Sequence, residues 1–357
     1  MPPPSLIAAV CLTAAGLAVL PGGSAHADDL PAVPWEGRTM GSPYTVQITG
    51  TNLPPVLVDV LRAEIEQRLQ EVNRQMSHYD PESEISRFNR APAGTPFKVS
   101  TGFARVVRFS LEMNRLSQGA FDPTLAPAIN LWGCGEKTDR RAVPPEADLA
   151  AAMAKTGCAR LVVTDRDELV KDTPDLTINL SAVAKGFGVD EMVRVLRGHG
   201  FTNLYASIAG EVRVLGRNAR GTPWQVGIAA PVAHWNENDP MAAVASLSDR
   251  ALSTSGDYQK FFTDAQGRRL CHILDPRTGW PVQNNVGGVS VVAPDSMTAD
   301  ALGTTLFVLG VEEGLRFIDA RPDCAALFIV RDPAGGFRQV PSTRFAELTS
   351  TPSDGSR

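Results

Sequence analysis

The segment over residues 270–281, with the sequence LCHILDPRTGWP, contains the residue best suited to chemistry. His272 lies inside a short apolar run that ends abruptly in the turn-forming residues 275–279. Proline after aspartate favours a turn and glycine completes it, so we expect a strand over 270–274 that enters a tight loop. A histidine held beside a rigid turn and an arginine can exchange a proton near an anionic ligand. The alternative is an ordinary histidine on a sheet face.

The segment over residues 181–188, SAVAKGFG, combines small residues with a lysine at the expected start of a helix. We expect a strand over 176–180 before it. Backbone amides at a helix start attract phosphate, small side chains allow close approach, and Lys185 adds a positive charge. The spacing matches neither a P-loop nor G-x-G-x-x-G. A glycine-rich turn selected for packing is therefore the alternative.

Asp300 and Thr304 are four residues apart in a segment, 300–309, that we expect to be helical. This spacing places a carboxylate and a hydroxyl on one helix face. Such hard oxygen ligands suit Mg²⁺, which keeps water or substrate phosphate at its other positions. The alternative is that Asp300 is a charge near a helix N-terminus and that Thr304 packs.

An aromatic segment over residues 119–124, together with residues 130–133, mixes Phe121, Asp122 and Trp132 with turn formers. It can line a pocket for a flat heteroaromatic ring, with Asp122 accepting hydrogen bonds from that ring. An Asp-Pro turn packed on the core is the alternative. The chain contains no nucleophile elbow, H-E-x-x-H or Walker motif.

Periodicity predicts the elements that must position these residues. We expect a strand over 38–49 and an amphipathic helix over 58–76, with apolar residues three or four apart. Ser100 is expected to cap a second helix that stops near Gly119. Helices come early and many antiparallel strands come late, which favours an α+β fold in which two lobes form one domain. The tail from about 341 is expected to be loosely structured.

The N-terminus indicates export. Residues 1–27 contain no Asp, Glu, Lys or Arg, and the apolar run over 6–20 precedes a small-x-small cleavage site at 25–27. This pattern is typical of a secretory signal peptide, which leaves a mature domain over 28–357 in the periplasm or another extracytoplasmic space. Cys11 matches a lipoprotein cleavage box poorly, so a lipid anchor is the less favoured alternative.

Composition restricts the partners. The net charge is −5 and basic runs are absent, which argues against electrostatic binding to nucleic acid or anionic lipid. The mature cysteines, Cys134, Cys158, Cys271 and Cys324, have no framework spacing and no C-x-x-C pattern. We expect mostly buried free thiols, with Cys134–Cys158 as the pair to check first for a disulfide.

Together these motifs resemble those of the ApbE family of FAD:protein FMN transferases, bacterial enzymes of the cell envelope. Seven segments match in family order and cover nearly all of the mature chain: 39–44 (TMGSPY), 76–89 (MSHYDPESEISRFN), 119–135 (GAFDPTLAPAINLWGCG), 180–190 (LSAVAKGFGVD), 253–258 (STSGDY), 272–281 (HILDPRTGWP) and 293–310. One departure lies at residues 207–211, SIAGE, where relatives often have an aspartate and paired glycines.

The resemblance implies an α+β fold of two lobes, the second related to the tunnelling-fold type, with FAD as substrate in the cleft between them. It implies Mg²⁺ held by Asp300, Thr304 and the backbone carbonyl of Ala184. It also places these residues around FAD: Met40, Tyr79, Ala120, Phe121, Asp122, Lys185, His272 and Leu274.

The implied reaction is attack by a Thr or Ser hydroxyl of a client protein on the FMN-side phosphorus of FAD, with AMP leaving. Mg²⁺ and Lys185 would neutralise charge, and His272 would take the hydroxyl proton. Clients in such families include flavoprotein subunits of membrane redox complexes. A Mg²⁺-dependent FAD pyrophosphatase and a flavin-binding accessory protein without chemistry are the two alternatives.

Overall fold

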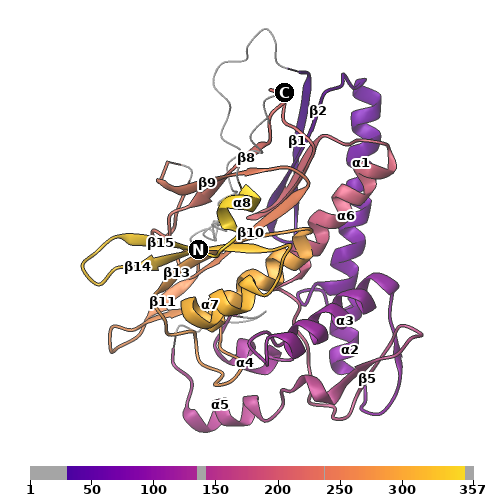
Figure 1. Ribbon diagram of the computed structural model, residues 1–357. Coiled ribbons are helices and arrows are strands. Elements are labelled where there is room, and N and C mark those ends of the chain that lie inside the picture. Colours follow the sequence, from indigo (N-terminus) through magenta and orange to yellow (C-terminus); the bar gives the residue numbers. More distant parts are fainter. Residues whose placement is uncertain (1–29, 135–141, 237, 350–357) are drawn as a thin grey trace, which may run out of the picture.

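An eight-stranded antiparallel sheet forms the centre of the molecule in the computed structural model, which describes residues 30–134, 142–236 and 238–349 (Figure 1). The expected signal peptide lies outside these residues. The strands follow the order β1 (Ala32–Thr39), β2 (Ser42–Thr49), β6 (Leu204–Ile208), β7 (Glu211–Leu215), β10 (Arg250–Gly256), β13 (Val286–Ala293), β14 (Ala325–Arg331) and β15 (Phe337–Pro341). The predicted α+β fold class is confirmed.

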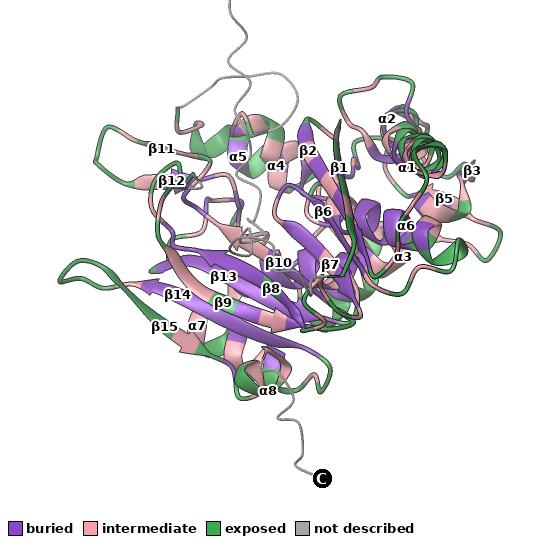
Figure 2. Ribbon diagram, turned by 90° about the horizontal axis from the view of Figure 1, so that it is seen from above, coloured by how far each residue is buried: buried purple, intermediate pink, exposed green. Residues whose placement is uncertain are grey.

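Each face of this sheet is covered by a different layer. Val291 packs with helix α7 (Ser296–Asp319), whereas the next residue, Val292, packs under the hairpin of β8 (Trp224–Ala229) and β9 (Met241–Leu247). This alternation follows from the two-residue period of a strand. On the α7 face, α6 (Ala184–Gly198) covers β6 and β7, and α1 (Pro55–Met76) packs on α6. Figure 2 shows the central strands as almost wholly buried.

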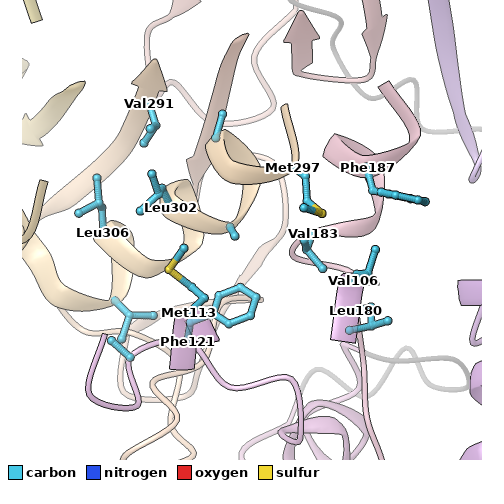
Figure 3. Close-up of a cluster of buried hydrophobic side chains, with 14 of the residues drawn as sticks. Val106, Met113, Phe121, Leu180, Val183, Phe187, Val291, Met297, Leu302 and Leu306 are labelled. Atoms are coloured by element: carbon cyan, nitrogen blue, oxygen red, sulfur yellow. The ribbon is translucent and has the colours of Figure 1, made fainter. Parts of the chain in front are cut away.

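The remaining elements lie beside these layers. They are α2 (Glu84–Arg90), β3 (Phe97–Lys98), α3 (Thr101–Leu116), α4 (Ala126–Leu131), α5 (Glu146–Met153), the 3₁₀ helix η1 (Cys158–Arg160), β4 (Leu161–Val163), β5 (Glu168–Lys171), β11 (Phe261–Thr263) and β12 (Arg269–Cys271). Side chains of α3 such as Met113 join Leu302 and Leu306 of α7 in one apolar core (Figure 3). No helix in the described part of the chain is long and apolar enough to cross a membrane.

The local signals for the early helices are confirmed. The helix expected over 58–76 is α1, and its apolar positions Leu61, Ile65 and Leu69 are buried. Ser100 caps α3, because its Oγ accepts a 3.3 Å hydrogen bond from the Phe103 amide. Helix α7 begins four residues before the expected segment and has a kink at Gly310.

The prediction of a single strand over 38–49 is wrong, because these residues form the end of the first strand, the turn and the second strand of a hairpin. β1 pairs with β2 in register from Thr39↔Ser42 outward, and Met40 and Gly41 form the turn. Their φ angles, 49° and 71°, are those of a two-residue type I′ turn, whose twist matches that of the flanking strands. This turn places Met40 at the end of the sheet.

The strand expected over 176–180 is absent. Leu176, Ile178 and Leu180 are fully buried, as their alternation indicates, but side chains replace the partner strand. The Asn89 amide donates to the Ile178 carbonyl (3.0 Å) and accepts from its amide (2.8 Å). Lys171 Nζ donates to the Leu176 carbonyl (3.0 Å). The segment is held by these side chains without belonging to a sheet.

The tail expected to be loose from about 341 is ordered to residue 349. A short helix, α8 (Phe345–Thr349), packs Phe345 and Leu348 on the core under β8 and β9. Residues 350–357 lie outside the described part of the chain.

Candidate active site

A cleft of about 1680 Å³ brings together residues from distant parts of the chain. Its walls come from the β1–β2 turn, the ends of α1 and β12, the starts of α6 and β7, the loop over 120–125 and helix α7. Of the predicted site residues, these line the cleft: Met40, Tyr79, Ala120, Phe121, Asp122, Lys185, His272, Leu274, Asp300 and Thr304. Ala184 does not line it but is the first residue of α6 and adjoins Lys185.

Helices α6 and α7 cross at the floor of the cleft and cap each other. The Gly186 amide, in the first turn of α6, donates a 2.9 Å hydrogen bond to Asp300 Oδ2 on α7. In return, Asp190 on α6 accepts from the Ser296 amide (3.0 Å) and the Met297 amide (2.9 Å) at the start of α7. Helix N-termini leave unpaired amides, so each carboxylate stabilises the other helix.

Glycine is required at this crossing. A Cβ on Gly186 would lie 2.3 Å from the Ser296 carbonyl oxygen and 2.8 Å from Asp300 Cβ. The backbone of α6 therefore approaches α7 as closely as contact allows. This brings the start of α6, with Lys185, beside the Asp300 carboxylate at the cleft.

Three charged groups meet beside this crossing. Lys185 forms an ion pair with Glu211 on β7, and its Nζ lies 4.0 Å from Asp300 Oδ1. Burial alone would lower the pKa of Lys185, but the charges of Asp300 and Glu211 outweigh it and raise that pKa above its usual value. Burial raises the pKa of Asp300, with Lys185 opposing the shift. The lysine is therefore a fixed cation that contacts Glu211 directly and Asp300 at a longer distance.

The donor set fits a hard cation. Asp300 and Thr304 are one turn apart on α7, and the start of α6 lies against Asp300. No group of three or more His, Cys, Asp or Glu side chains that could hold a metal occurs in the described residues. A cation here would therefore use one carboxylate together with hydroxyl and carbonyl oxygens, which suits Mg²⁺ with its retained waters. The residues present fit the magnesium expectation.

His272 lies directly after β12 rather than within a strand, which corrects the prediction for 270–274. Its amide and its Nδ1 both contact the Lys260 carbonyl, at 3.2 Å and 3.3 Å. A carbonyl only accepts, so the neutral ring carries its proton on Nδ1 and has its lone pair on Nε2. Burial, and then the charge of Lys260, lower the pKa of His272 to about 4. The ring is therefore a neutral base at physiological pH.

The aromatic loop divides its residues between core and cleft. Phe121 is buried in the core with Met113 and Leu302, so most of the surface of its ring contacts the core and little of it faces the cleft (Figure 3). Asp122 Oδ1 accepts from the Thr124 amide (2.7 Å), the Thr124 hydroxyl (2.6 Å) and Cys158 Sγ (3.2 Å). These bonds fix its carboxylate at the cleft wall.

The structure also places Tyr79 and shows the state of the cysteines. Tyr79, 68% exposed, lies at the mouth of the cleft with its ring 4.2 Å from that of His78. The four described cysteines are free thiols, and Cys134 and Cys158 are not bridged. Cys271 and Cys324 are buried, whereas Cys134 is exposed.

Glu211 is a site residue that the sequence did not predict as one. It is the first residue of β7, follows the Ala209–Gly210 turn, and is only 4% exposed. Its carboxylate also accepts a 2.9 Å hydrogen bond from Ser253 Oγ. A carboxylate at the start of a strand that is mostly buried was the only available signal.

Comparison with known proteins identifies the family. The family model described as "ApbE family" matches residues 40–328, which includes every predicted site residue. The chain belongs to the ApbE family. It is 37% identical over 316 residues to the FAD:protein FMN transferase of Vibrio cholerae (88% of this chain, 92% of the relative). It is 35% identical over 319 residues to that of Haemophilus influenzae (88% and 91%).

Solved ApbE structures share the fold. The flavin transferase ApbE from Vibrio cholerae superposes with a TM-score of 0.81 at 36% identity, covering 89% of this chain and 99% of that one. The apo flavinyl transferase ApbE from Pseudomonas stutzeri gives a TM-score of 0.80 at 33% identity, covering 91% and 99%.

Proposed function

We propose that this ApbE protein is a Mg²⁺-dependent FAD:protein FMN transferase that attaches FMN to a Thr or Ser hydroxyl of a client protein. The observation that carries the proposal is the convergence of Lys185, Asp300 and the neutral His272 in one cleft, in a chain whose relatives bear this activity. The cleft exceeds a typical small-molecule pocket, so it can admit FAD together with part of a client.

The reaction replaces a phosphoanhydride bond of FAD with a phosphoester bond to the client. The client oxygen forms a bond to the FMN-side phosphorus of FAD, the pyrophosphate P–O bond breaks, and AMP leaves with its phosphate. Nε2 of His272 is the group that takes the hydroxyl proton, since Nδ1 is committed to the Lys260 carbonyl. Lys185 lies where it can neutralise pyrophosphate oxygens. Mg²⁺, when bound by Asp300, Thr304 and the Ala184 carbonyl, would supply further charge neutralisation.

The protein holds the catalytic groups in fixed positions as well as supplying their charges. Such transfers depend on holding the two oxygens and the phosphorus in line. The mutual capping of α6 and α7 fixes Lys185 and Asp300 to the same rigid crossing, and the Lys260 carbonyl fixes the ring of His272. The fold therefore arranges these groups before any ligand binds.

Incubation of the mature chain with FAD, Mg²⁺ and candidate envelope flavoprotein subunits tests the proposal. Intact-mass analysis should show one FMN added to a Thr or Ser of a client, with an equimolar amount of AMP. Rapid AMP release that is independent of any client would instead indicate a pyrophosphatase. FAD binding with neither product would indicate an accessory protein.

We also infer that the protein acts outside the cytoplasm. The support is the apolar leader over 1–27 and its small-residue cleavage site. A flavoprotein subunit of a membrane redox complex is the proposed client, so any membrane association would come through that client. N-terminal sequencing of protein from a fractionated cell tests the cleavage, which we expect between residues 27 and 28.

A further inference from the structure

Glu211 is a buried carboxylate that the proposed reaction does not use. It lines the cleft, is 4% exposed, and has two partners: the Lys185 ammonium and the Ser253 hydroxyl. An ionised carboxylate is retained in such a place only when it is paired and hydrogen-bonded.

The pairing decides which carboxylate holds the lysine. Lys185 Nζ contacts Glu211, whereas its distance to Asp300 Oδ1 is 4.0 Å. Asp300 Oδ2 accepts from the Gly186 amide, so Oδ1 is the oxygen of Asp300 that faces the lysine. Without Glu211, Asp300 would be the remaining carboxylate beside a half-buried ammonium, and the 4.0 Å ion pair would close into a direct contact.

We propose that Glu211 is a positioning residue that holds Lys185 away from Asp300 and so leaves Asp300 able to bind a divalent cation. This inference rests on the magnesium site of the proposed function. Glu211, Asp300 and Lys185 together carry one net negative charge in a buried place. A divalent cation reverses that charge and so favours the anionic pyrophosphate.

Neutralising Glu211 and neutralising Lys185 have opposite consequences. Glu211→Gln leaves a neutral Lys185–Asp300 pair that a cation must break. Lys185→Gln leaves two carboxylates without a counter-ion, which attracts a cation more strongly. The double variant restores the net charge of −1 and removes the competing lysine. A merely structural role for Glu211 predicts that Glu211→Gln weakens binding by the same factor whether residue 185 is Lys or Gln, whereas the positioning role predicts a smaller factor when the lysine is absent.

Mn²⁺ binding to the mature chain, measured by calorimetry and electron paramagnetic resonance without FAD or client, tests this. We expect Kd to be at least about tenfold weaker in Glu211→Gln and severalfold tighter in Lys185→Gln. The double variant should return to within about threefold of the unaltered chain. Glu312→Gln, which removes an exposed charge from α7, is the matched control and should change little.

Wild-type Mn²⁺ affinity in Glu211→Gln would overturn the proposal, as would a double variant no better than Glu211→Gln. Failure of both the unaltered chain and Lys185→Gln to bind Mn²⁺ would also overturn it. If Glu211→Gln misfolds, Lys185→Gln still tests the claim that the lysine competes for Asp300: a gain in affinity does not come from unfolding, and an unchanged affinity would overturn the proposal. Since neither FAD nor a client is present, these results are separate from the outcome of the transfer assay.

Discussion

The Gly186 amide donates a 2.9 Å hydrogen bond to Asp300 Oδ2, and this bond joins the start of α6 to the proposed metal-binding face of α7. Because Asp190 caps α7 in return, the two helices fix each other's N-termini. The carboxylate is therefore held by secondary structure rather than by a loop, and sites built in this way are the more precise.

Substitution of Gly186 by alanine should disrupt this crossing. The new Cβ would lie 2.3 Å from the Ser296 carbonyl oxygen, which is backbone and cannot rotate away. We expect Gly186→Ala to lower the free energy of unfolding by about 1–3 kcal/mol, the range for overpacked sites. Urea denaturation followed by circular dichroism measures it.

Gly198 provides the control on the same helix. A Cβ there would meet no heavy atom within 4 Å, and its φ is not in the left-handed region. Gly198→Ala should therefore be neutral or stabilise the protein by up to about 1 kcal/mol, since alanine favours a helix. Equal losses in the two variants would contradict the close-contact argument.

Substitution of Asp300 by asparagine separates the metal ligand from the helix cap. Asparagine can still accept a hydrogen bond from the Gly186 amide, but it lacks the negative charge that a hard cation requires. We expect transfer of FMN to fall by about a hundredfold or more, with a melting temperature within a few degrees of the original. Transfer at the original rate would refute the assignment of Asp300 as a ligand.

The sequence predicted the helices and helix caps, which depend on residues close together in the chain. The three- or four-residue spacing of Leu61, Ile65 and Leu69 predicted α1, and Ser100 predicted the start of α3, because helices and caps are local. The candidate site residues were predicted from motifs that occur in family order. Their meeting in one cleft depends on strand pairings that no local pattern encodes, such as β2 with β6.

Two features could not be predicted for a physical reason. The alternation over 176–180 gives buried side chains but does not say what satisfies the backbone, and here Asn89 and Lys171 do so in place of a strand. The place of Glu211 depends on Lys185 and Ser253, which are 26 and 42 residues away. A single charged residue in a sequence does not show its distant partners.

Alkylation should distinguish the four mature cysteines. Cys134 is exposed, whereas burial raises the pKa of Cys271 and of Cys324 to about 11, so their reactive thiolates are scarce at pH 8. We expect iodoacetamide to modify Cys134 first and all four thiols only after unfolding. Peptide mass spectrometry under non-reducing conditions measures this, and a Cys134–Cys158 bridge in the native protein would contradict the structure.

The charge of Lys260 should add to the effect of burial in lowering the pKa of His272. Burial and Lys260 together lower the pKa of the ring to about 4, so it stays neutral, and able to accept a proton, as the pH falls from 7 to 5. Lys260→Met removes one of these two causes, so the pKa should rise by about half a unit to one unit toward its ordinary value of about 6.5. The acid limb of kcat/KM should then move to higher pH as well.

An NMR titration of the ring, assigned with His272→Gln, measures the pKa of His272 directly. Lys98→Met, which removes an exposed lysine on β3 that does not act on His272, should leave the titration unchanged. An unshifted ring in Lys260→Met would show that the charge of Lys260 does not contribute to the low pKa of His272.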